Sequence, residues 1–137
     1  MSYPITDIQG IDGQAAAALK SAGIRSTGAL LDKASTVKGR KLLAEKTCFD
    51  DEQLLCWANG ADRMRVKGVS KEYATLLKYA GVDTVKELAH RNAKNLTAAM
   101  HKVNDEHQIV RFLPSEKVVE RWIEHAKTLP LMISYRR

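Results

Sequence analysis

Two short glycine turns carry the residues best suited to hold a ligand. Each reads hydrophobic, any residue, Gly, hydrophobic, then a small or polar residue that opens an Ala/Leu-rich segment, from Ile8 to Asp12 and from Val66 to Ser70. The pattern predicts a tight hairpin between two helices. Such a turn points backbone N–H groups and the positive end of the next helix outward, where a phosphate oxygen can bind. Glycine lets the backbone adopt positive φ and come close to the anion.

The second turn has the more favourable surroundings for a phosphate. Its fifth residue, Ser70, can donate a hydroxyl hydrogen bond, and lysines flank the turn on both sides. Amides and cations of this kind hold a nucleic-acid backbone without reading bases. We therefore assign nucleic-acid binding to Arg63, Arg65, Lys67, Gly68, Val69, Ser70 and Lys71.

The first turn is the secondary candidate, with Gly10, Ile11 and Gly13 as its residues. Asp12 is the fifth residue of this turn, and its carboxylate would repel a phosphate. Gly13, next to it, partly restores the turn. A purely structural interpretation stays open for both turns, in which glycine shapes the hairpin, Ile and Val fill the core, and the lysines face water.

The elements that position these turns occur twice in the chain. Residues 8–31 align with residues 66–89 at an offset of 58, with seven identical positions among 24. Residues 50–57 align with residues 115–122 at an offset of 65. A repeat of this kind indicates a repeated structural unit. We place one repeat at residues 1–64 and the second at residues 65–137, the latter ending in an apolar tail, and expect both to pack as one compact helical body.

Each repeat is predicted to be helical. Ala/Leu-rich segments end at Gly23 and Gly81, Ser26 and Thr84 are placed as N-caps of the next short helices, and no segment alternates with the period of a strand. Further helices are expected behind caps at Asp50 and Ser115, with Trp57 and Trp122 as core anchors. The fold class is therefore all-α.

Gly10-Ile11 and Gly68-Val69, each followed about a dozen residues later by Ala-Gly-Ile or Ala-Gly-Val, resemble the helix-hairpin-helix motif of DNA-repair and DNA-processing proteins. Nearly the whole chain, including residues 61–69, 82–88 and 113–123, is similar to a family of small bacterial proteins catalogued as a domain of unknown function. The resemblance implies an all-helical fold of tandem hairpins and, less directly, nucleic-acid binding. The DNA-binding members that the motif resembles usually have a second glycine two positions after the first, where this chain has Asp12 and Ser70.

Composition and the remaining polar residues favour some classes of function over others. The 137 residues are 45% hydrophobic and 28% charged, with a net charge of +6, which favours a polyanionic partner. The four histidines and two cysteines lack the spacing of a metal or catalytic site, so we expect no enzyme, no metal and no cofactor. No signal peptide or membrane span is visible, so a cytoplasmic location is expected.

Two further features, an aromatic residue and a basic segment, point to nucleic acid more weakly. Tyr79 could stack a base if it is exposed. The basic segment with Lys38, Arg40, Lys41 and Lys46 could extend a phosphate track, although acidic residues follow it closely and a solvated surface is the favoured interpretation.

The sequence is compatible with two functions. The first is a non-enzymatic module that binds nucleic acid, DNA rather than RNA, by its phosphate backbone through the second hairpin. The alternative is an interaction or scaffold module, in which the hairpins serve a protein partner or a homodimer. The apolar tail at residues 129–135 and the carboxylate of Asp12 favour this alternative.

Overall fold

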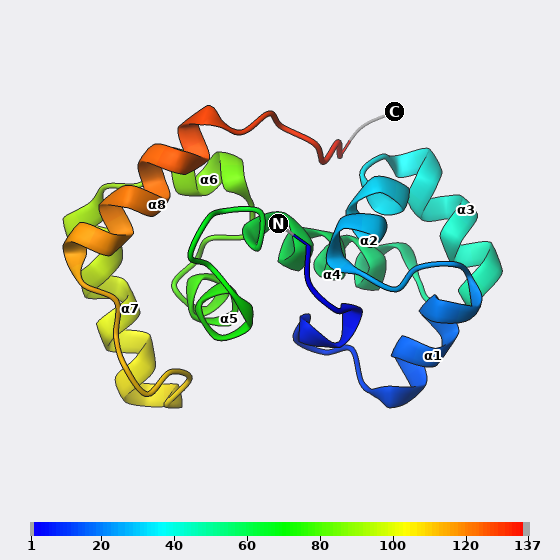
Figure 1. Ribbon diagram of the computed structural model, residues 1–137, viewed down its shortest axis with the longest axis horizontal. Coiled ribbons are helices and arrows are strands. Elements are labelled where there is room, and N and C mark those ends of the chain that lie inside the picture. The colour runs from blue at the N-terminus through cyan, green and yellow to red at the C-terminus, as the bar shows by residue number, and fades with distance from the viewer. Residues whose placement is uncertain (1, 136–137) are drawn as a thin grey trace. The chain divides into compact units, whose positions relative to one another are not determined.

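The computed structural model describes residues 2–135, which form eight α-helices and one 3-10 helix and contain no sheet (Figure 1). The predicted all-α class is confirmed. The elements are η1 (Ile5–Asp7), α1 (Gly13–Ser21), α2 (Thr27–Ala34), α3 (Val37–Thr47), α4 (Asp51–Arg63), α5 (Lys71–Tyr79), α6 (Val85–Ala89), α7 (Ala93–His107) and α8 (Glu116–Thr128).

The chain divides into two compact units, one of residues 2–62 with 132–135 and the other of residues 63–131. The end of the apolar tail therefore belongs with the first unit, whereas the sequence placed the whole tail with the second repeat. Hydrogen bonds hold it there. Ser134 N–H donates to the carbonyl of Ser35 at 2.7 Å, and Arg40 Nη2 donates to the carbonyl of Ser134 at 2.6 Å. These contacts join residues almost a hundred positions apart, so no local sequence pattern could predict them.

The helix ends follow the predicted local signals. Gly23 and Gly81 have φ of +86° and +95° directly after the C-caps of α1 and α5. The Ser26 hydroxyl accepts from Ala29 N–H, and the Thr84 hydroxyl accepts from Glu87 N–H. These side chains satisfy amides that the first turn of a helix leaves without a partner.

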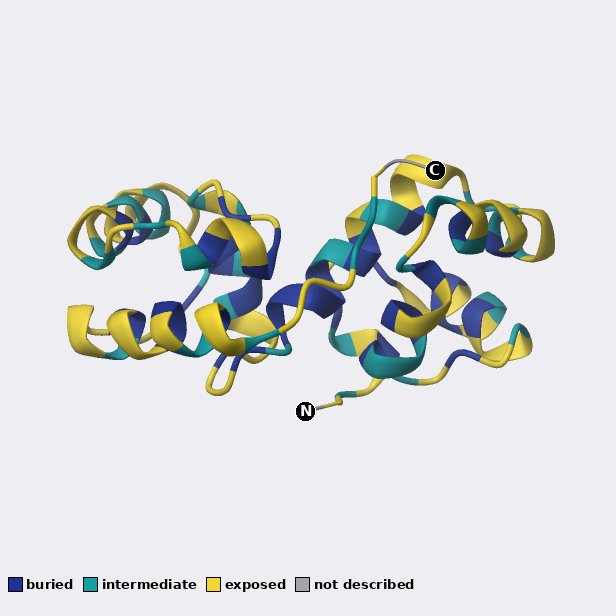
Figure 2. Cartoon of the chain, turned by 90° about the horizontal axis from the view of Figure 1, so that it is seen from above, coloured by how far each residue is buried: buried dark blue, intermediate teal, exposed yellow. Residues whose placement is uncertain are grey.

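The second unit builds its core around α8. This helix packs against α6 and α7, and α5 packs against α7, so the apolar sides of four helices meet (Figures 1 and 2). Trp122 of α8 is 2% exposed and confirms the predicted core anchor. Other side chains with no exposed surface in this unit include Val69, Leu76, Leu77, Leu96 and Met100.

In each unit a buried tryptophan lies below a hairpin glycine. Gly10 and Gly68 both have φ of +92°. A Cβ atom on Gly10 would lie 3.3 Å from Nε1 of Trp57, and one on Gly68 would lie 3.0 Å from Nε1 of Trp122. Each turn thus requires glycine for two separate reasons: the backbone has a left-handed conformation, and the indole lies too close for a side chain.

Candidate nucleic-acid interface

The second turn is tight and leads directly into α5. Val66 and Val69 are fully buried, and Val69 N–H donates to the Val66 carbonyl at 3.0 Å. Lys67, Gly68 and Ser70 are exposed. The two valines therefore fix the turn to the core while the residues around them stay accessible to a ligand.

The N-terminus of α5 is open. Ser70 is its N-cap residue but makes no side-chain capping hydrogen bond. The backbone N–H groups of Lys71, Glu72 and Tyr73 have no acceptor in the described structure. An open first turn carries partial positive charge and free donors, which is the arrangement that binds a phosphate oxygen.

Every other α-helix of the described chain has a side-chain cap. In six of them the N-cap residue accepts from an amide of the first turn, and in α4 the Asp50 carboxylate accepts from Gln53 N–H at 2.7 Å. A cap of this kind satisfies one amide, and the first amides of every helix lack an intrahelical partner. What distinguishes α5 is therefore its third amide, that of Tyr73, which no side chain caps.

The corresponding position in the first hairpin is closed by the chain itself. Asp12 Oδ1 accepts from Ala15 N–H at 2.8 Å and caps α1. Gly10 is exposed, Ile11 is buried, and Gly13 is the first residue of α1. The carboxylate thus occupies the place that a phosphate oxygen would take, in addition to repelling it.

Three of the residues predicted to contact nucleic acid instead hold the protein's own fold together. Arg63 is 4% exposed, and its Nε and Nη1 donate to the carbonyls of Ala74 and Asp83 at 2.9 and 3.0 Å. Val69 is a core residue, and Arg65 Nη2 donates to the Pro130 carbonyl at 2.6 Å. Placing Arg63 and Val69 in the binding surface was wrong, because the fold uses the guanidinium to satisfy carbonyls and the valine to fill space. Lys67, Gly68, Ser70 and Lys71 remain accessible.

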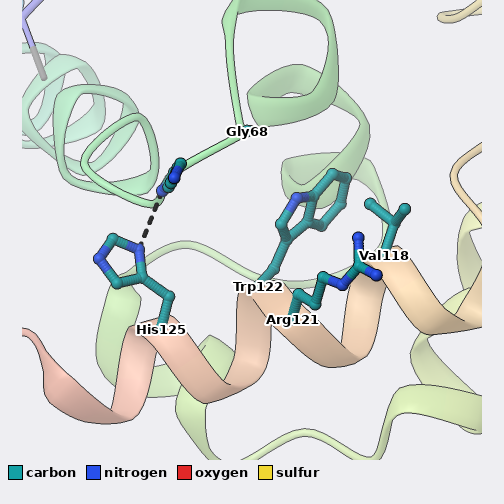
Figure 3. A pocket seen from close by; sticks show the side chains of 6 residues that line it. Gly68, Val118, Arg121, Trp122 and His125 are labelled. Atoms are coloured by element: carbon teal, nitrogen blue, oxygen red, sulfur yellow. Dashed lines mark hydrogen bonds between the residues drawn. The ribbon is translucent and has the colours of Figure 1, made fainter.

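The turn faces α8 across a pocket of about 450 Å³ (Figure 3). His125 and Trp122 point from α8 toward the turn, and the Lys67 N–H donates to His125 Nδ1 at 2.9 Å. One turn amide is therefore closed by a side chain. None of the described residues that line the pocket is acidic, and they are Lys67, Gly68, Val118, Arg121, Trp122 and His125.

Sequence reasoning missed Arg121 and His125. They lie four residues apart and so share one face of α8, but more than fifty residues separate them from the turn. The internal repeat pointed to this helix only through Trp122. The signal that could have added this helix to the predicted site was an arginine directly before Trp122 and a histidine three residues after it.

One of the four basic residues predicted on α3 is buried. Arg40 is buried and donates from Nη1 to the Ala34 carbonyl at 2.8 Å as well as to Ser134. Lys38, Lys41 and Lys46 are exposed. Arg40 is thus a structural residue, which corrects both the favoured interpretation of a solvated surface and the alternative of a phosphate track at this position.

Comparison with known proteins defines the class of this helical chain. The family model described as "Domain of unknown function (DUF4332)" matches residues 9–129, so the chain belongs to that family. Searches of curated proteins and of solved structures found no match. Within the described residues, no group of three or more His, Cys, Asp or Glu could hold a metal ion.

Proposed function

We propose that the chain is a non-enzymatic module that binds nucleic acid, with DNA as the expected form, by its phosphate backbone at the second hairpin. The observation that carries the proposal is the uncapped N-terminus of α5, with free amides at Lys71, Glu72 and Tyr73. The exposed ammonium groups of Lys67 and Lys71 lie on the same turn. Amides and ammonium groups together supply hydrogen bonds and charge to a phosphate without reading a base.

Two further observations support an anionic ligand. The pocket beside the turn is lined by Lys67 and Arg121 and has no acidic lining residue among those described. At the corresponding place in the first hairpin a carboxylate oxygen of Asp12 accepts from the third amide of α1, which supports an anionic oxygen as the ligand of the α5 amides. In the described residues no helix is both long and apolar enough to cross a membrane.

The sharpest test makes the second hairpin resemble the first. Ser70→Asp places a carboxylate at the N-cap of α5, where it can accept from the Tyr73 amide as Asp12 accepts from Ala15. We expect the affinity for a short DNA duplex to fall at least about tenfold, since a hydrogen bond to a charged group contributes about 1.5–3 kcal/mol. Ser70→Asn closes the amide without adding charge and should also weaken binding.

The control for charge is Gln14→Glu. It lowers the net charge by the same amount as Ser70→Asp, but in the exposed first turn of α1 in the other unit. We expect binding close to that of the parent. If Ser70→Asp and Gln14→Glu have equal effects, net charge governs binding and the α5 seat is refuted.

A second test uses the salt dependence of binding. Lys67→Ala combined with Lys71→Ala should lower the slope of log affinity against log salt by about 1.5, because each phosphate neutralised contributes about 0.7–0.9. Lys38→Ala combined with Lys41→Ala removes two exposed lysines from α3 and serves as the matched control. Equal slopes for the two double variants would contradict the proposal.

One observation favours the alternative, a module that contacts a protein or a second copy. Leu131 is 64% exposed and Tyr135 is 53% exposed near the end of the chain. Light scattering at several concentrations, with Leu131→Ser as the variant, measures whether these apolar side chains assemble the protein. A monomer at all concentrations argues against the homodimer.

A further inference from the structure

The loop between α7 and α8 holds an aromatic side chain in water. Phe112 is 75% exposed, the largest fraction among the large hydrophobic side chains described. A single exposed apolar residue is common on protein surfaces and carries no argument by itself. What distinguishes Phe112 is the way in which the surrounding loop is held.

Asn104 braces the start of this loop. Its Oδ1 accepts from Ile109 N–H at 2.8 Å and from Val110 N–H at 2.9 Å, and its Nδ2 donates to the Val110 carbonyl at 3.2 Å. Val110 and Pro114 are buried on either side of Phe112. The backbone is therefore anchored before and after the phenyl ring, and the ring is presented to solvent on a fixed support.

The loop is also tied to the open end of α5. The Tyr73 hydroxyl donates to the Phe112 carbonyl at 3.0 Å. Tyr73 is the third residue of α5, and its own N–H is one of the free donors. The Arg111 guanidinium carbon lies over the Phe112 ring, 5.9 Å from its centre, and places a cation on one face of the ring. The loop that carries the aromatic ring and the cation is thus joined by one hydrogen bond to a residue of the open first turn of α5.

We propose that Phe112 stacks an unpaired base while the α5 amides hold a neighbouring phosphate, so that the ligand is single-stranded nucleic acid. The inference rests on the proposed function and specifies its ligand. Stacking on an aromatic side chain requires an accessible base face, which a single strand offers and a continuous duplex does not. Arg111 can pair with a phosphate of the same strand.

Tyr79, the aromatic that the sequence suggested for stacking, is less suited to it. It is the last residue of α5, at the opposite end of the helix from the free amides. Its ring packs against the ring of His107, with the ring centres 4.7 Å apart, and a smaller fraction of it is exposed than of Phe112. Tyr79 is 43% exposed and therefore provides a matched control in the same unit.

The test measures fluorescence anisotropy of a labelled oligothymidylate and of a labelled duplex of equal length at one salt concentration. The parent should bind the single strand more tightly. Phe112→Ala should weaken single-strand binding about tenfold, as expected for the loss of one stacked base, and leave duplex binding unchanged. Tyr79→Ala should change neither, and Phe112→Trp should restore single-strand binding.

Three outcomes separate this inference from the proposed function. Equal affinity for both oligonucleotides, with no effect of Phe112→Ala, overturns the inference and leaves backbone binding in place. Binding of neither oligonucleotide overturns the proposed function as well. Quenching of the new indole in Phe112→Trp by the single strand and not by the duplex supports stacking, and the absence of any quenching refutes it.

Discussion

The backbone N–H of Lys67 donates a 2.9 Å hydrogen bond to Nδ1 of His125, a residue 58 positions further along the chain. Because Nδ1 is the acceptor, the neutral imidazole carries its proton on Nε2. The bond joins the second turn to α8 one helical turn beyond Trp122, whose indole lies below Gly68. Helix α8 thus stabilises the turn in two ways, by the packing of Trp122 under Gly68 and by this hydrogen bond.

Loss of the imidazole should loosen the turn more than it destabilises the unit. We expect His125→Leu to lower the free energy of unfolding by about 0.5–1.5 kcal/mol, because the Lys67 amide loses its acceptor but can still bond to water. Hydrogen exchange at the Lys67 amide should become faster. His101→Leu, an exposed position on α7, is the control. Unchanged exchange at Lys67 would show that the bond does not restrain the turn.

Gly68 should be intolerant of any side chain. Gly68→Ala forces a non-glycine residue to φ +92° and brings its Cβ within 3.0 Å of the Trp122 indole. We expect a destabilisation of at least about 1–2 kcal/mol in urea unfolding. Gly13→Ala is the matched control, since nothing lies within 4 Å of its Cβ position. Equal stability of the two variants would contradict this account of the turn.

Arg40 should hold the end of the tail on the first unit. Its burial lowers the pKa of the guanidinium, which stays charged at neutral pH, and Arg40→Met removes the donors to the carbonyls of Ala34 and Ser134. The expected cost is about 1–3 kcal/mol, with faster hydrogen exchange at Ser134 N–H. Lys41→Met, at an exposed position of the same helix, should be neutral. A protected Ser134 amide in Arg40→Met would argue against this role.

Glu72 should limit the affinity of the second hairpin for anions. It is exposed in the first turn of α5, beside the free amides, and its carboxylate opposes a phosphate there. Glu72→Gln should therefore strengthen binding of an oligonucleotide about two- to fivefold at low salt, with the gain lost at high salt. Glu45→Gln changes the net charge equally on α3 and is the control. The same gain in both variants would indicate a general charge effect.

Local features of this chain could be predicted from the sequence because they act within a few residues. A cap bonds an amide two or three positions on, and a glycine adopts positive φ where it stands. The sequence could therefore predict the ends of α1 and α5, the caps Ser26 and Thr84, and the glycine turns. The periodic placement of Trp57 and Trp122 likewise predicted their burial.

The composition of the candidate site required the tertiary structure. Whether a charged side chain can bind a ligand depends on whether the fold places distant hydrogen-bond acceptors beside it. The guanidinium of Arg63 donates to the carbonyls of Ala74 and Asp83, which lie beyond the second turn in the sequence. Helix packing brings His125 to the Lys67 amide of the turn, and a bond from the Tyr73 hydroxyl joins the loop of Phe112 to α5. Nor does the type of residue 70 reveal its role, since serine caps α8 at Ser115 and leaves α5 open at Ser70.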